Sequence, residues 1–253
     1  MAAQYKILDI SKYQPDVDYG KLKADGIDGV IIRAVSTNTT GLYIDPCFEK
    51  HYRNCKALGI PVGAYFYSYA VTAADIDKEI DLFLQAIRGK TFEYPVYIDV
   101  EDAVQRKANR QTVTNTVKYG LTRLENAGYY AGWYTYKAFF NSYIYADQLT
   151  AFDLWLRSWT STKPIPSLYN NYGMWQYTSD GSISAISARC DLSYAYKNYP
   201  DIIKSNHLNG FTGDDITPTP TPSTPDEAFA ILDDMSRKLD ALRRCLTKLK
   251  NLL

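Results

Sequence analysis

Four carboxylates stand where predicted strands end, and their number and spacing point to acid–base chemistry. They are Asp9, Asp99, Glu101 and Asp191. Successive side chains of a strand point to opposite faces, so Asp99 and Glu101 share one face of their strand. Crowded carboxyl groups raise the pKa of at least one member, and a carboxylic acid that stays protonated near neutral pH is the proton donor of glycoside cleavage. One aspartate at a strand end more often caps a helix or holds a loop, but four on strands that meet indicate a catalytic site.

Other catalytic groups are scarce in this chain. Its 253 residues include only two histidines, His51 and His207, which excludes a zinc site of several histidines and disfavours a histidine-based nucleophilic triad. The four cysteines fit no paired metal spacing. Cys47 and Cys55 lie about 12 Å apart along one predicted helix, which is too far for a disulfide. We therefore expect free thiols, no metal and no cofactor, and a surface position for His51.

Eight predicted strands position the carboxylates, and helical segments separate the early strands. The strands are expected near residues 5–10, 29–35, 61–69, 94–101, 129–135, 153–159, 172–178 and 188–193. Three helical segments end at Gly26, Gly59 and Gly128, because glycine accepts the left-handed turn just past a helix. The alternation predicts an α/β fold, and eight strands predict a (β/α) barrel with its active site at the carboxyl ends of the strands.

The last third of this barrel is expected to be irregular. The connections between the last three strands are too short and too polar for full helices, so we predict fewer than eight helices. Closure of the barrel makes the first and last strands neighbours, which brings Asp9 to Asp191. All four carboxylates would then lie at one barrel mouth.

Aromatic residues form the second part of the predicted site. Sugars present apolar faces that stack on aromatic rings, while their hydroxyls need polar partners, and the chain has 23 tyrosines. Tyr65 and Tyr67 share one strand face, and Tyr134 and Trp159 end two later strands. We predict these four residues as sugar contacts, although core packing would explain each of them equally well. Trp175 is predicted to be structural.

Charge and composition divide the chain into parts. Lysines and arginines number 28, as do aspartates and glutamates, so there is no electrostatic case for binding nucleic acid or an anionic membrane. Residues 217–225 alternate threonine or serine with proline, the composition of a stiff extended linker. We predict a catalytic barrel over residues 1–210, a Thr/Pro-rich linker over 211–225 and a coiled-coil helix over 226–253.

The tail has the pattern of a coiled coil. Its apolar residues alternate spacings of four and three, as in Ala228, Leu232, Met235, Leu239, Leu242, Leu246, Leu249 and Leu253. A single helix cannot bury this stripe alone. Residues 226–240 carry five acids, whereas residues 241–253 carry only basic charges, so antiparallel pairing sets opposite charges together. We expect homo-oligomers through 226–253, with antiparallel pairs favoured. A helix packed on the barrel and an element that binds the wall or a membrane are the alternatives.

In combination, the motifs of the chain resemble glycoside hydrolase family 25, the Chalaropsis-type lysozymes that include many phage endolysins. The matching segments run in family order over about residues 5–200: Asp9-Ile10-Ser11-Lys12-Tyr13-Gln14-Pro15, Gly29-Val30-Ile31-Ile32-Arg33-Ala34, Pro61-Val62-Gly63-Ala64-Tyr65-Phe66-Tyr67-Ser68, Pro95-Val96-Tyr97-Ile98-Asp99-Val100-Glu101, Leu154-Trp155-Leu156, Trp175-Gln176-Tyr177-Thr178-Ser179 and Asp191-Leu192. Each short motif is ordinary, and their combination is specific.

The resemblance implies a lysozyme that cleaves the β-1,4 bond from N-acetylmuramic acid to N-acetylglucosamine in peptidoglycan. It implies that Glu101 is the general acid and that Asp99 stabilises the acetamido group or the intermediate, with Asp9 and Asp191 completing the pocket. A direct nucleophilic role for Asp99 stays open. The separation of the two carboxyls bears on it, because the carboxyls of a direct retaining pair are only about 5 Å apart. The alternatives are a glycosidase that acts on another N-acetylglucosamine polymer, such as chitin, and an inactive sugar-binding module of the same fold.

The N-terminal sequence bears on where such an enzyme would act. Met-Ala-Ala-Gln-Tyr-Lys has no basic region followed by an apolar stretch, so no signal peptide is expected, and no run reaches the ~18 apolar residues of a membrane span. With the resemblance, this predicts a protein that is made in the cytoplasm of a bacterial host, without a signal peptide, and that acts on the cell wall after release.

Overall fold

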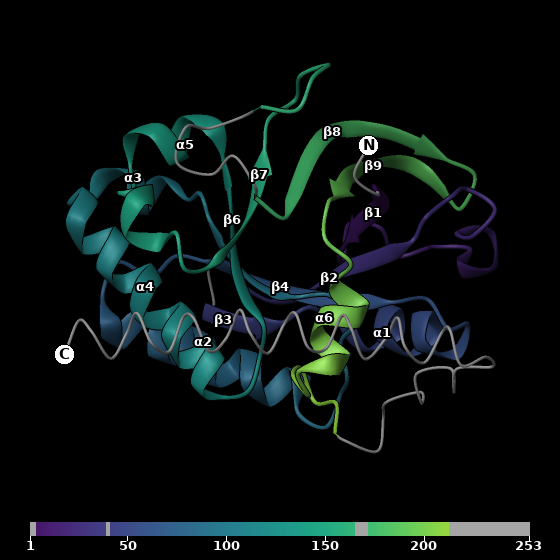
Figure 1. Cartoon of the computed structure of the whole chain (residues 1–253), viewed down its shortest axis with the longest axis horizontal. Helices are drawn as coiled ribbons and strands as arrows, with labels where there is room; N and C mark the ends of the chain where they lie inside the picture. Colours follow the sequence, from purple (N-terminus) through teal and green to yellow (C-terminus); the bar gives the residue numbers. More distant parts are fainter. Residues whose placement is uncertain (1–3, 39–40, 165–171, 213–253) are drawn as a thin grey trace, which may run out of the picture. The chain divides into compact units, whose positions relative to one another are not determined.

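Eight strands close into a barrel in a computed structural model that describes residues 4–38, 41–164 and 172–212 (Figure 1). These residues belong to a unit that spans Met1–Asp214. The strands of the barrel are β1 (Tyr5–Ile10), β2 (Gly29–Asn38), β4 (Val62–Ser68), β5 (Val96–Val100), β6 (Ala131–Tyr136), β7 (Asp153–Arg157), β8 (Met174–Ile183) and β9 (Ile186–Ala195). The short strand β3 (Gly41–Ile44) pairs with β2 outside the barrel. The predicted irregular α/β barrel is thus confirmed.

The barrel is mixed, and its last strand differs from the expectation. Strands β1, β2 and β4 to β8 pair in parallel, whereas β9 runs antiparallel to both β8 and β1. Only residues 184–185 separate β8 from β9, and a parallel connection needs a dozen or more residues. Asp191 therefore lies within an antiparallel strand and not at a carboxyl end. Its Cα is nevertheless the register partner of Asp9, so the predicted meeting of these two strands is confirmed.

Six α-helices occur in the described part of the chain, in agreement with the predicted shortage of helices. They are α1 (Phe48–Ala57), α2 (Ala73–Ile87), α3 (Ala103–Lys107), α4 (Arg110–Asn126), α5 (Lys137–Ser142) and α6 (Tyr199–Ser205). Gly59 and Gly128 follow α1 and α4 with φ angles of 62° and 86°, the left-handed conformation that ends these helices. The predicted coiled coil of residues 226–253 lies outside the described residues.

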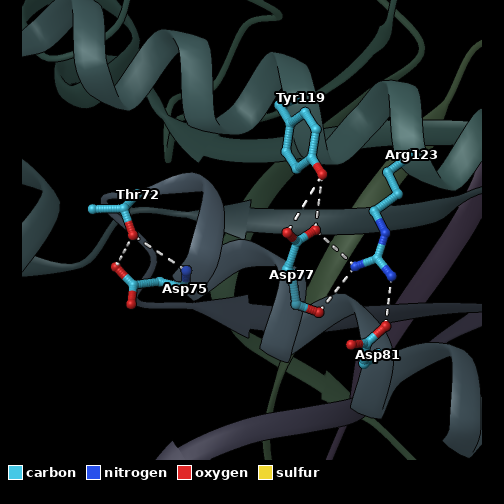
Figure 2. A network of polar contacts seen from close by, with 6 residues as sticks. All are labelled: Thr72, Asp75, Asp77, Asp81, Tyr119 and Arg123. Atoms are coloured by element: carbon cyan, nitrogen blue, oxygen red, sulfur yellow. Dashed lines mark hydrogen bonds and ion pairs between the residues drawn. The ribbon is translucent and has the colours of Figure 1, made fainter.

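Helices α2 and α4 are tied to each other by a network of side chains (Figure 2). Arg123 of α4 places Nη1 3.0 Å from Asp77 Oδ1 and Nη2 2.5 Å from Asp81 Oδ1, both on α2. The Tyr119 hydroxyl donates to Asp77 Oδ1 at 3.1 Å. At the start of α2, Thr72 Oγ1 accepts a hydrogen bond from the Asp75 backbone N–H. The contacts that Arg123 and Tyr119 make with α2 orient the two helices, and such exposed contacts contribute little to stability because solvent screens them.

The barrel strands bury both of their faces. Residues on the outer face pack with the helices in a large cluster that includes Phe66, Ile98, Trp133 and Leu154. On the inner face, Ile31, Tyr97, Trp155 and Met174 belong to a second, smaller cluster that fills part of the barrel. Because side chains alternate along a strand, residues two positions beyond this inner cluster also point into the barrel. The polar site is built on those positions.

No helix in the described ranges is long and apolar enough to cross a membrane.

Candidate active site

A pocket at the barrel mouth contains all four predicted carboxylates. Asp9, Asp99, Glu101 and Asp191 line it together, from strands β1, β5 and β9 and the residue that follows β5. The other lining residues are Ile10, Ser11, Tyr13, Gln14, Arg33, Tyr65, Tyr67, Tyr134, Trp155, Arg157 and Gln176. Residues more than 180 positions apart in the sequence thus share one cavity.

Glu101 is placed by the short turn from β5 into α3. Asp102 caps α3, with its Oδ1 accepting from the Val104 N–H at 2.8 Å, and Gln105 Oε1 accepts from the Asp102 N–H at 3.1 Å. This capping box fixes the backbone directly after Glu101. The Tyr67 hydroxyl donates to the other oxygen of Asp102 at 3.2 Å, so β4 supports the same turn.

Asp99 lies deeper in the pocket than Glu101. It sits within β5, two residues after Tyr97 of the inner cluster, and its side chain is buried, whereas Glu101 is partly exposed. Asp99 Oδ1 is buried and has no hydrogen-bond partner among the described residues. A buried acceptor without a donor is costly, and at a pocket wall it is available to a ligand N–H or O–H.

Gln176 joins the two carboxylates on the opposite side of the pocket. Its Nε2 donates to Asp9 Oδ2 at 3.2 Å and to Asp191 Oδ2 at 3.4 Å. Its Oε1 accepts a hydrogen bond of 3.0 Å from the Tyr134 hydroxyl, which fixes the orientation of the amide. Asp9 and Asp191 are therefore held as a pair by one side chain.

Two arginines face the pocket. Arg157 Nη2 lies 3.1 Å from Glu101 Oε2. Arg33 is buried and donates through Nε to Asp45 Oδ2 at 2.9 Å, an ion pair that its Nη2 also joins at 2.8 Å. Arg33 therefore forms a buried salt bridge. Asp45 also accepts from the Lys12 backbone N–H at 3.1 Å, so this pair holds the loop after β1.

The carboxylates shift one another's pKa values. Burial raises the pKa of Asp9 well above its usual value, and the charge of Asp191 raises it further. Burial also raises the pKa of Asp99 well above its usual value, with the charge of Glu101 adding to the effect. For Glu101 and Asp191 the pKa is likewise raised by burial, against the opposing charge of Arg157. The carboxyls of such a cluster bind protons more tightly than isolated carboxyls do.

Three of the four predicted sugar contacts line the pocket, and the fourth does not. Tyr65, Tyr67 and Tyr134 face the cavity. Trp159 lies beyond the end of β7 and is 56% exposed, and the centre of its ring is 5.1 Å from Arg157 Cζ. Trp175 faces the outer cluster and donates to the Ser158 carbonyl at 2.7 Å, as its predicted structural role requires.

Sequence reasoning missed Trp155, Arg157 and Gln176 as pocket residues. Period-two alternation would have found them, because Arg157 follows inward-facing Trp155 by two positions, as Gln176 follows Met174. This alternation is hard to recognise in the sequence, because Trp155 and Trp175 lie on neighbouring strands but their side chains point to opposite faces of the barrel wall.

The prediction that His51 lies on the surface is wrong. The side chain is fully buried, with Nδ1 2.7 Å from the Tyr19 hydroxyl and Nε2 3.1 Å from the Ser11 carbonyl. Burial lowers its pKa, so the ring is neutral and serves as a hydrogen-bond bridge between α1 and the loop after β1. Free thiols are confirmed for the three cysteines that the structure describes, Cys47, Cys55 and Cys190.

A family model described as glycosyl hydrolases family 25 matches residues 8–186 of the chain, a span that includes Asp9, Asp99 and Glu101. The chain belongs to glycosyl hydrolase family 25. The resemblance seen in the sequence motifs is thus confirmed, and the irregular barrel with its carboxylate pocket is the scaffold of a glycosidase family.

Individual relatives agree with this assignment. The autolytic lysozyme of Clostridium acetobutylicum is 29% identical over 192 residues, which are 74% of this chain and 54% of that protein. The chain therefore spans about half the length of that curated relative. The crystal structure of the CTP1L endolysin has a TM-score of 0.68 and 27% identity, covering 79% of this chain and 70% of the endolysin. The modular autolysin LytC from Streptococcus pneumoniae, solved in complex with a synthetic peptidoglycan ligand, has a TM-score of 0.68 and 25% identity, with coverages of 76% and 47%.

Proposed function

We propose that the protein is a peptidoglycan hydrolase of the lysozyme type, an N-acetylmuramidase that cleaves the β-1,4 bond between N-acetylmuramic acid and N-acetylglucosamine. The observation that carries the proposal is the cluster of four carboxylates, two of them buried, in the pocket of a family 25 chain. Relatives described as a lysozyme, an endolysin and an autolysin with a peptidoglycan ligand support the substrate.

In this proposal Glu101 protonates the leaving glycosidic oxygen. Burial and neighbouring acids raise the pKa of Glu101, so its carboxyl holds a proton at a higher pH than a free glutamate does. Glu101 is also the member of the Asp99–Glu101 pair that is nearer to solvent, where a long glycan enters. These two properties are those that a general acid of glycoside cleavage needs.

Asp99 is proposed to act on the acetamido group of the muramic acid residue. Its buried Oδ1 has no partner within the described ranges and is available to accept the acetamido N–H. That hydrogen bond would orient the acetamido oxygen toward the anomeric carbon and stabilise the positive charge that develops there. Asp9 and Asp191 complete the negative field of the pocket, and Gln176 holds them in place.

The pocket tyrosines are proposed to bind the sugar rings. Tyr65, Tyr67 and Tyr134 combine an apolar ring face with a hydroxyl, which suits both faces of a sugar. Trp159 is proposed as a contact farther along the glycan, because it is exposed and lies beside Arg157 without lining the pocket.

Loss of turbidity of purified bacterial cell walls tests the function. The unmodified protein is expected to clear the suspension, and Glu101→Gln is expected to lower the rate by at least about 100-fold, because the isosteric amide binds but cannot donate a proton. Binding of both forms to the walls without clearing would instead favour an inactive sugar-binding module. Clearing of chitin but not of walls would favour the other glycosidase.

We propose further that residues 226–253 pair with the same segment of another copy, antiparallel pairs being favoured by the acidic and basic halves of the segment. The barrel of residues 1–210 would then be carried on the linker of 211–225. Its site of action is proposed to be the bacterial cell wall, in endolysin-type cell lysis, after synthesis and release from the cytoplasm of a bacterial host.

A further inference from the structure

Arg157 is the pocket residue whose charge the proposed cleavage does not use. It ends β7 two residues after Trp155, so its side chain reaches the inner face of the barrel and lines the pocket. Its Nη2 is 3.1 Å from Glu101 Oε2. An arginine beside a proton donor opposes protonation, because it favours the ionised carboxylate. The pairing is therefore unfavourable for the proposed reaction unless substrate changes it.

The guanidinium of Arg157 has hydrogen-bond donors to spare. Arg33, the other pocket arginine, donates a hydrogen bond from Nε to Asp45, and its Nη2 joins the same buried ion pair. For Arg157, Glu101 is the single polar side-chain partner in the described part of the chain, and a guanidinium carries five N–H donors. A quarter of the Arg157 side chain is exposed, at 25%. An incoming anion can therefore reach donors that the protein leaves unused.

Two aromatic rings hold this guanidinium at the rim of the pocket. Its Cζ lies 4.8 Å from the ring centre of Tyr136 and 5.1 Å from that of Trp159. Cation–π contacts are made through the flat face of the guanidinium, so they orient the group without using the N–H donors at its edge. Arg157 is thus positioned by its neighbours and still open to a ligand.

We propose that Arg157 is a specificity-determining residue that binds a carboxylate of the wall glycan beside the scissile bond, and that this carboxylate displaces Glu101 from the guanidinium. The inference rests on the muramidase function proposed above. A muramic acid residue carries a lactyl group that ends in a carboxyl, and stem peptides add further carboxylates. Both sources offer the planar, two-oxygen anion that an arginine binds through two parallel hydrogen bonds.

Displacement of Glu101 from Arg157 would favour the protonated form of Glu101, which is the form that donates the proton. The charged or titratable side chains that face Glu101 come from six strands of the barrel, from the N-cap of α3 and from α3 itself: Asp9, Tyr67, Asp99, Asp102, Arg106, Tyr134, Arg157 and Asp191. Burial raises the pKa of Glu101, and Arg157 exerts the largest opposing influence. Once a substrate carboxylate neutralises Arg157, this opposing influence weakens, the pKa of Glu101 rises further, and its carboxyl binds a proton from solvent more readily. A neutral glycan would leave Glu101 paired with Arg157, and the opposing influence of that charge would stay in place.

The experiment measures kcat/KM against pH for the full chain and three variants. Arg157→Gln removes the charge. Arg157→Lys keeps the charge but lacks the planar guanidinium that can form two parallel hydrogen bonds. Arg123→Gln is the matched control, since that arginine of α4 is paired with acids of α2 (Figure 2). The substrates are peptide-free wall glycan with free lactyl carboxylates, the same glycan with those carboxylates amidated, intact peptidoglycan and a neutral chitin oligosaccharide.

The unmodified protein is expected to prefer a carboxylate-bearing glycan over its amidated form by about tenfold or more, the effect of charge-assisted hydrogen bonds. Arg157→Gln should abolish this preference and move the alkaline limb of the profile to higher pH, because the largest influence that opposes protonation of Glu101 is then removed. Arg157→Lys should keep the limb near its original position, and Arg123→Gln should change neither quantity. Comparison of peptide-free glycan with intact peptidoglycan identifies which carboxylate is bound.

An Arg157→Gln protein that keeps both the preference and the alkaline limb overturns the inference and leaves the muramidase function standing. If the unmodified protein cleaves no glycan, the proposed function fails, and calorimetry still tests the site. N-acetylmuramic acid should bind the unmodified protein at least tenfold more tightly than N-acetylglucosamine. Equal affinities, or a difference that Arg157→Gln retains, would also overturn the inference.

Discussion

At the scale of single residues, Gln176 controls the geometry of one half of the acid cluster. It donates to both Asp9 and Asp191 and accepts from Tyr134. Gln176→Leu keeps a similar volume but removes these bonds, so the two carboxyls lose their shared donor and the pKa of Asp9 rises further. We expect kcat/KM on cell walls to fall about 10- to 100-fold, the effect of hydrogen bonds to charged groups.

The matched control for this variant is Tyr134→Phe, which removes only the hydroxyl that donates to Gln176 Oε1. Its loss should stay below about tenfold, since a neutral hydrogen bond contributes about 1 kcal/mol. Wild-type activity in Gln176→Leu would show that the Asp9–Asp191 pair needs no such support.

The acids of the site could be predicted from the sequence, whereas their partners could not. A carboxylate at the end of an apolar strand is conspicuous, and the alternation of Asp99 and Glu101 fixes the inward face of β5 without tertiary knowledge. To predict Arg157 and Gln176 one must know which side chains of β7 and β8 point into the barrel. That depends on how the bulky tryptophans of these strands pack against the rest of the molecule. Burial of His51 depended likewise on a loop 40 residues away in the sequence.

At the scale of elements, Glu79 joins α2 to the strand and helix that flank the site. The buried carboxylate of Glu79 accepts from Ser68 Oγ at 2.6 Å and from the Tyr69 N–H at 2.8 Å, where β4 ends. Gln105 of α3 reaches the same place and donates to the Ala70 carbonyl at 3.3 Å. Burial raises the pKa of Glu79 to about 7 from its usual value of 4.5.

This shift predicts a pH-dependent stability with a definite sign. The folded state binds the Glu79 proton more tightly than the unfolded state, so the contribution is fully present below pH 4.5 and is lost as the pH rises toward 7. Denaturant unfolding should show the stability of the unmodified protein falling relative to Glu79→Gln by up to about 3 kcal/mol across that interval. The exposed Glu49→Gln is the control, and parallel curves for the unmodified protein and Glu79→Gln would contradict the prediction.

The strand pattern was predictable at this scale, but the direction of the last strand was not. Eight apolar runs and glycine-ended helices were enough to predict a barrel and its neighbours. The reversal of β9 depends on a two-residue connection at 184–185. The predicted last strand begins at residue 188, two residues after the observed start at Ile186, so the predicted connection is longer and does not indicate a tight turn. Asp191 reaches the pocket all the same, because closure of the barrel makes β9 the neighbour of β1 and the antiparallel register pairs it with Asp9.

At the scale of the whole molecule, the tail determines the proposed oligomeric state. Sedimentation of the full chain should give a mass greater than that of one copy, and a chain that stops at Thr217 should sediment as a monomer, because the leucine seam has been removed. Leu242→Glu in the full chain is the matched variant that keeps the length and disrupts the seam. Monomeric masses for all three proteins would refute self-association through the tail.

Analysis of the sugar ends released from purified peptidoglycan tests the proposed muramidase activity most directly. We predict that each cleavage exposes N-acetylmuramic acid at the new reducing end, and that Glu101→Gln releases at least about 100-fold fewer ends under the same conditions. New reducing ends that carry N-acetylglucosamine, or equal release by the Glu101→Gln variant, would contradict the account.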